Sequence, residues 1–169
     1  MSGSVLFNIT ALLVGTVITA LSGCAQFAIP SLATGTGAAE VRARLGAPSD
    51  ERTVSGSKAW DYVQGPQGFT TWRLTFDAAD RIAKVEQILT ERRIGSIEAG
   101  KHSKEDVANL LGRPVEMTLF RAKGEEVWTY RFLDVQERKL GDVYFDASSG
   151  RAKMTITYPD PAYVNANDF

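Results

Sequence analysis

Residues 106–114 read D-V-A-N-L-L-G-R-P, and residues 40–48 read E-V-R-A-R-L-G-A-P. In the later stretch Val107, Leu110 and Leu111 fall at positions i, i+3 and i+4, so they form one apolar stripe on a helix. Both stretches then continue with a glycine and a proline. Glycine adopts the left-handed conformation that ends many helices, and proline cannot continue one. The sequence therefore predicts the same terminated helix twice.

The two predicted helices differ in how they begin. Ser103 stands three residues before Asp106, a spacing close to that of a capping box. Acidic residues in the first turn stabilise a helix through its dipole. In the earlier helix, Gly37 takes the position of Ser103 and Glu40 that of Asp106, so the cap has no side chain. We therefore expect the second helix to be the stronger one.

Three further matches follow each helix in the same order. They are Trp60-Asp61-Tyr62 with Trp128-Thr129-Tyr130, Phe76-Asp77-Ala78 with Phe145-Asp146-Ala147, and Ala83-Lys84 with Ala152-Lys153. Four matches in preserved order at a nearly constant offset indicate an internal duplication.

Downstream of each helix the periodicity changes to two. Apolar and polar residues alternate there, as in antiparallel strands with one buried face. The alternating stretches are 71–76, 127–132 and 151–158. Turn signals lie at 65–68 and 148–150, and residues 90–99 fit a short helix. The predicted fold class is α+β: a tandem repeat of a small unit with one or two helices and a three-stranded antiparallel sheet.

Charge divides the chain sharply. The sequence has 19 Lys and Arg and 20 Asp and Glu, and every one of them lies at or after Glu40. The uncharged beginning and the charged remainder therefore need separate explanations. The predicted segments are a lipoprotein signal peptide (1–23), a lipid-anchored tether (24–35), a first repeat (36–89), a second repeat (90–158) and a C-terminal tail (159–169).

The uncharged beginning contains an apolar run from residue 5 to residue 21, whose length suits a signal sequence or a short membrane span. Leu21, Ser22 and Gly23 then precede Cys24, the single cysteine of the chain. This tetrapeptide resembles the lipobox of bacterial lipoproteins, in which the cysteine is acylated and the preceding residues are removed.

The lipobox resemblance implies that Cys24 is the lipidation site and that the protein is attached to a membrane through it. Ala25 after the cysteine implies the periplasmic face of the outer membrane. The first four residues carry no Lys or Arg, which signal peptides normally have. An uncleaved membrane helix that ends in a buried Cys24 thiol is therefore the alternative.

Several function classes have little support in the composition. A net charge of −1 argues against nucleic-acid binding, which normally needs a basic excess. One cysteine and one histidine, His102, exclude a zinc site built on several thiolates and leave no nucleophile–base constellation. We therefore expect a protein that is not an enzyme and that uses no metal or cofactor.

The series V-x-x-L-L-G-x-P, W-x-Y and F-D-x resembles the SmpA/OmlA (BamE-like) family of small outer-membrane lipoproteins, over most of residues 36–158. The resemblance implies an αα-βββ unit and links the chain to the outer-membrane barrel assembly machinery. That family's assembly subunit has one copy of the unit, whereas this chain has two. Tandem copies of the same fold also occur in the β-lactamase inhibitor protein, which binds an enzyme through its sheet face.

These observations predict a lipid-anchored periplasmic protein-binding or scaffold module of the outer membrane, in outer-membrane protein assembly or envelope maintenance. The alternative is a proteinaceous inhibitor of a hydrolase. We expect Trp60 and Trp128 in the core and the polar face of each sheet free, either as a solvated surface or as a partner-binding surface. Arg73 and Arg131 are the candidate partner-binding residues. On the last strand the free face would carry Arg151, Lys153, Thr155 and Thr157.

Overall fold

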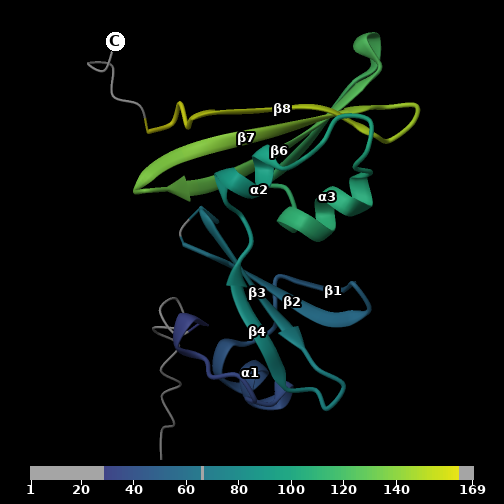
Figure 1. The fold of residues 1–169 in the computed structure, drawn as a ribbon. Coiled ribbons are helices and arrows are strands. Elements are labelled where there is room, and N and C mark those ends of the chain that lie inside the picture. The colour runs from purple at the N-terminus through teal and green to yellow at the C-terminus, as the bar shows by residue number, and fades with distance from the viewer. Residues whose placement is uncertain (1–28, 66, 164–169) are drawn as a thin grey trace, which may run out of the picture.

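The computed structural model describes residues 29–65 and 67–163. It contains two four-stranded antiparallel sheets, stacked one above the other with helices beside each (Figure 1). The predicted α+β class is confirmed. The expectation of three strands in each unit is wrong, because each sheet has a further strand directly after its helix.

The first half of the chain forms the lower part of Figure 1. Its strands are hydrogen-bonded in sequence order, β1-β2-β3-β4. The elements are η2 (Ile29–Ser31), α1 (Ala38–Leu45), β1 (Asp50–Val54), β2 (Ser57–Gln64), β3 (Thr70–Phe76) and β4 (Ile82–Gln87).

The second half forms the upper part, with strand order β5-β6-β7-β8. The elements are α2 (Glu91–Gly95), α3 (Lys104–Leu111), β5 (Glu116–Phe120), η3 (Arg121–Lys123), β6 (Glu125–Asp134), β7 (Glu137–Asp146) and β8 (Ala152–Pro159).

The predicted helix signals are confirmed. Ser103 and Asp106 form a capping box, in which each side chain accepts a hydrogen bond from the other residue's backbone N–H. Gly37 begins α1 without a side-chain cap. The short helix expected within 90–99 is α2, which Thr90 caps by accepting from the backbone N–H of Arg93.

The first core lies between α1 and the inner face of the first sheet. Val41 packs there with Trp60, whose ring meets Phe76 edge-on at 4.7 Å. Ile29 and Leu32 belong to the same core and are 1% and 8% exposed. The expectation of a tether over 24–35 is therefore wrong from residue 29 onward, because these two apolar side chains are buried.

The second core lies between α2 and α3 on one side and the second sheet on the other. Ile94, Val107 and Leu111 pack against aromatic and aliphatic side chains of β6 and β7. Trp60 is a core residue, as expected. Trp128 is only partly buried, and its indole N–H donates to the Glu126 carboxylate at 2.6 Å.

The folded part of the second half does not end at residue 158, where the second repeat was expected to give way to a tail (159–169). Strand β8 continues to Pro159, and Asp160 is 2% exposed. Tyr163 stacks edge-on against Phe69 of the first half, with ring centroids 5.6 Å apart. Residues 160–163 therefore pack across both halves instead of forming a tail.

No helix within the described ranges is long and apolar enough to cross a bilayer. The apolar run at residues 5–21 lies outside those ranges.

Candidate functional site

The polar face of the first sheet is covered by the second half of the chain. Arg73 is 2% exposed there and forms a two-pronged ion pair with Asp61. Gly112, with φ +83°, ends α3 against this pair, since an added Cβ would lie 3.2 Å from an Asp61 carboxylate oxygen. The expectation that Arg73 lies on a free face is therefore wrong.

Three arginines bind the end of α3. Arg52, Arg73 and Arg93 donate in turn to the carbonyl oxygens of Ala108, Asn109 and Leu110. The last carbonyls of a helix lack intrahelical partners and carry partial negative charge, so guanidinium groups stabilise them. The first sheet and α2 therefore hold α3 in place.

A groove of about 380 Å³ remains between the halves beside these contacts. The two arginines that line it form ion pairs, Arg73 with Asp61 and Arg93 with Glu86. No group of three or more potential metal ligands occurs in the described part of the chain. The groove thus offers neither a metal site nor an unpaired cation for an anionic ligand.

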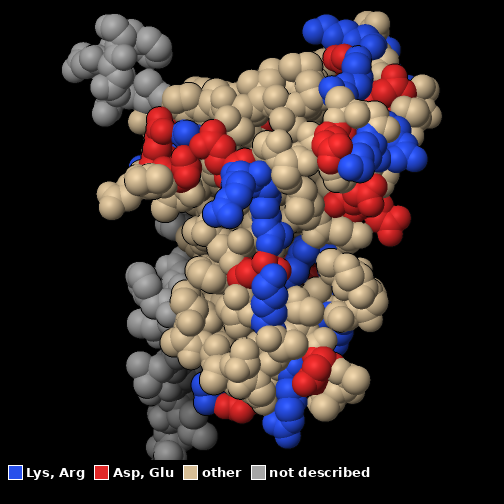
Figure 2. All heavy atoms as spheres, in the orientation of Figure 1, with Lys and Arg blue, Asp and Glu red and all other residues tan. Residues whose placement is uncertain are grey.

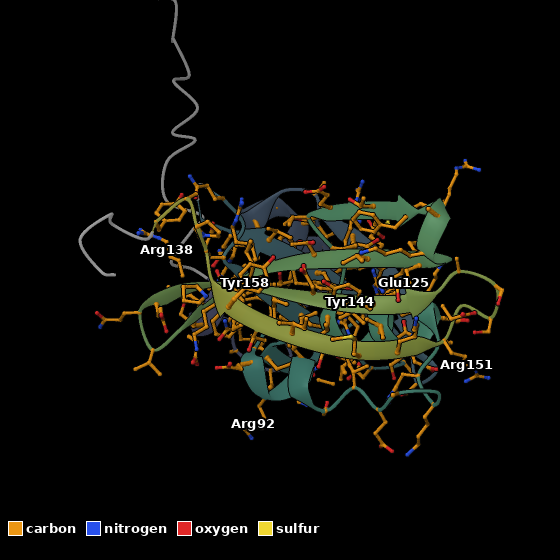
Figure 3. The ribbon with its side chains drawn as sticks, turned by 90° about the horizontal axis from the view of Figure 1, so that it is seen from above. Arg92, Glu125, Arg138, Tyr144, Arg151 and Tyr158 are labelled. Carbon is orange, nitrogen blue, oxygen red and sulfur yellow. The ribbon has the colours of Figure 1, made fainter. Side chains whose placement is uncertain are left out.

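The second sheet has one face that no described element covers, and Figure 3 looks down on it. We call it the outer face. The strand registers place nine of its side chains in three rows across β6, β7 and β8. The rows are Val127, Tyr144 and Met154; then Thr129, Asp142 and Ile156; then Arg131, Leu140 and Tyr158.

The side chains of β8 lie on the sheet faces opposite to those expected. A β-bulge shifts the register between Tyr144 and Phe145, so that Phe145 pairs with Ala152 but Tyr144 pairs with Met154. A bulge sets two residues against one and so reverses which side chains face the helices. Thr157 consequently points to the helical side, where its hydroxyl donates to Glu91 of α2 at 2.9 Å. The apolar residues of β8, not its threonines and basic residues, lie on the outer face.

The outer face is mostly apolar and partly exposed. Met154 is 48% exposed and Ile156 39% exposed. Figure 2 shows the molecule from the side, with the outer face at its upper edge, and the surface visible along β8 is mostly uncharged. Contiguous exposed apolar surface on a folded protein marks an interaction site more often than isolated apolar residues do.

Asp142 lies at the centre of the outer face. Its carboxylate accepts a hydrogen bond from the Thr129 hydroxyl at 2.7 Å and one from the Tyr158 hydroxyl at 3.0 Å. Burial, together with that hydrogen bond and the nearby carboxylate charge, raises the pKa of Tyr158 to about 12. Tyr158 is therefore a hydroxyl donor at neutral pH.

One end of the outer face is closed by a cluster of charged and aromatic groups. Arg131 donates to Asp160 at 2.9 Å, and its guanidinium lies 5.8 Å from the ring centre of Phe69. Arg138 stacks over Tyr163 at 4.3 Å and over Phe69 at 5.6 Å. These contacts hold the end of β8 and the loop between β2 and β3 together beside the face.

The predicted site residues are not brought together. Cys24 and the preceding Leu21, Ser22 and Gly23 lie outside the described residues. Arg131 lies on the outer face, as expected from its position among the polar residues that alternate along its strand. The buried Arg73 lies in the junction between the halves. The sequence did not point to Asp142. It also did not place the apolar residues of β8 on the outer face, because the alternation in 151–158 does not reveal the bulge.

No protein-family model matches the chain, and no curated protein matches it. Among solved structures, a DUF4309 family protein (YjgB) from Bacillus subtilis shares 13% identity, with 73% of this chain and 78% of that chain covered and a TM-score of 0.31. A candidate β-lactamase inhibitor protein from Streptococcus mutans also shares 13%, with 73% and 83% covered and a TM-score of 0.29. An extracellular protein containing an SCP domain from Bacillus anthracis shares 14%, with 88% and 50% covered and a TM-score of 0.31. Similarity at this level identifies no shared function.

Proposed function

We propose that the chain is a lipid-anchored periplasmic module of the outer membrane that holds a protein partner on its outer face, in outer-membrane protein assembly or envelope maintenance. The observation that carries the proposal is the uncovered apolar face of the second sheet, with Met154, Ile156 and two tyrosines. Tyrosine, methionine and arginine are enriched at protein interfaces, and a sheet presents them on a rigid support.

The anchor is proposed from the lipobox resemblance at Cys24. Cys24 stands five residues before Ile29, which is buried in the first core. Five Cα–Cα steps span at most about 18 Å. An acylated Cys24 would therefore keep the folded halves close to the bilayer surface.

The two halves are proposed to be tandem copies of one unit. Both have a helix that ends at a glycine with positive φ, Gly46 and Gly112, followed by a four-stranded sheet. An isolated bridge joins the residue before each helix to the residue before the last strand, Gly37 to Arg81 and Ser103 to Arg151. The second copy covers the polar face of the first, so one sheet face remains for a partner.

Crosslinking in native membranes, followed by mass spectrometry, tests the proposed function. Met154→Glu places a charge on the outer face, and Met117→Glu is the matched control. Met117 is 58% exposed on β5, the other edge of the same sheet, and it pairs with Trp128 on the opposite face. We expect crosslinks to the partner to fall at least tenfold in Met154→Glu and to stay within twofold in Met117→Glu. Equal yields in both variants would contradict the proposal.

The partner recovered in that experiment separates the module from the alternative inhibitor. A barrel-assembly or other envelope protein supports the module. A hydrolase whose activity falls when this chain binds supports the inhibitor, the class that the Streptococcus mutans neighbour is described as belonging to.

A further inference from the structure

We infer that the partner presents a lysine or arginine side chain to Asp142. The inference rests on the proposed function, since it concerns the chemistry of whatever covers the outer face. It names the partner as a protein surface with one cation surrounded by apolar groups.

Asp142 occupies the centre of the three rows on the outer face. Thr129 and Ile156 flank it on the neighbouring strands, and Tyr144 and Leu140 flank it along β7. The residue is 9% exposed in the free protein. A partner that covers Ile156 and Tyr144 must therefore cover this carboxylate as well.

The carboxylate has no cation of its own. In the described part of the chain, no lysine or arginine nitrogen lies within ion-pairing distance of Asp142, and two hydroxyl groups donate to its carboxylate. Two basic residues beside the face already have acidic partners within the chain. Arg131 is paired with Asp160, and Lys153 is paired with Glu125 at 2.5 Å.

Covering Asp142 with an apolar surface would be unfavourable, because a carboxylate that loses its remaining water without gaining a counter-charge is strongly destabilised. A carboxylate accepts about four hydrogen bonds, and Asp142 uses two of them within the chain. The free acceptor capacity suits an ammonium or a guanidinium group, whose hydrogen bonds to a carboxylate are the stronger, charge-assisted kind.

Two small probes test the inference on the wild-type protein. Benzamidine carries a planar cation like that of arginine, and benzamide is its neutral counterpart. In amide-resolved NMR titrations, benzamidine should shift the resonances of Thr129, Asp142 and Ile156 at least five times more than benzamide does at the same concentration. Equal shifts by both probes would overturn the inference without requiring any variant to fold.

Asp142→Asn and Glu116→Gln supply the matched pair of variants. Glu116 is an exposed carboxylate on β5 that pairs with Thr129, so it lies at the edge of the same face. Benzamidine shifts should disappear in Asp142→Asn and persist in Glu116→Gln. Shifts that persist unchanged in Asp142→Asn would overturn the inference.

Crosslinking to the native partner separates this inference from the proposed function. We expect folded Asp142→Asn to lose partner crosslinks at least tenfold, as Met154→Glu does. Loss in Met154→Glu with full retention in Asp142→Asn would overturn the inference and leave the proposed function standing. Full retention in both variants would overturn both.

Discussion

Arg73 donates from Nε and Nη2 to the two carboxylate oxygens of Asp61, at 2.6 and 2.7 Å. The residues face each other across β2 and β3, and both side chains are almost fully buried. A third donor of Arg73 reaches the carbonyl of Asn109 on α3. This ion pair therefore lies where the first sheet meets the second half, and it leaves neither group for an outside partner.

Replacing Arg73 by alanine is expected to lower the free energy of unfolding by about 3–5 kcal/mol, because the buried Asp61 carboxylate loses its main partner. Arg42→Ala is the control, since Arg42 forms an ion pair with Glu51 in which both side chains are about half exposed. That change should cost less than about 1 kcal/mol. Chemical denaturation of both variants measures the difference, and equal small losses would show that the buried pair does not stabilise the fold.

The segment before α1 is expected to stabilise the first half. Ile29→Ala should cost about 2–5 kcal/mol, because Ile29 is 1% exposed in the first core. Thr34→Ala, at an exposed position of the same segment, should change stability little. Thermal or denaturant unfolding compares the two. If Ile29→Ala unfolds like the wild type, residues 29–35 are a tether after all.

Acid stability is expected to depend on Asp146. The hydroxyl of Ser148 and the N–H and hydroxyl of Ser149 donate to its carboxylate and hold its pKa well below the ordinary value. A carboxyl group with a lowered folded-state pKa stabilises the fold above its unfolded pKa of about 3.9, and that contribution is lost as the pH falls below it. Between pH 7 and pH 3, Asp146→Asn should therefore lose less unfolding free energy than the wild type. Parallel stability curves would contradict this assignment.

The anchor is expected to depend on Cys24. Metabolic labelling with a fatty-acid analogue should mark the wild type and leave Cys24→Ala unlabelled. The variant should also keep residues 1–23 and migrate as a larger form. An unlabelled wild type would rule out lipidation and leave the uncleaved membrane helix as the explanation of the apolar run.

Local signals predicted much of each half. The apolar stripe followed by a glycine predicted the helices α1 and α3. The alternation of apolar and polar residues predicted the strands β3, β6 and β8. The strands β1 and β5 were missed because they are edge strands without a clean alternation, and β5 is exposed on both faces. Short edge strands owe their conformation to pairing with a neighbour, which a local pattern does not record.

Which sheet faces are covered could not be predicted from the same signals. The polar face of the first sheet is buried because Arg52 and Arg73 bind the carbonyl end of a helix in the other half. The apolar side chains of β8 are exposed because a bulge at Tyr144 reverses them. Both outcomes depend on partners distant in sequence, whereas alternation shows only that a strand has two different faces.

Oxidation of the two exposed methionines of the second sheet tests the partner-bound outer face most directly. Met154 is 48% and Met117 is 58% exposed, on opposite faces, so each serves as the reference for the other. In the purified protein a hydroxyl-radical pulse should oxidise both at similar rates. In native membranes we expect Met154 to be protected at least fivefold relative to Met117. Equal oxidation of the two methionines in native membranes would contradict the claim that a partner occupies the outer face.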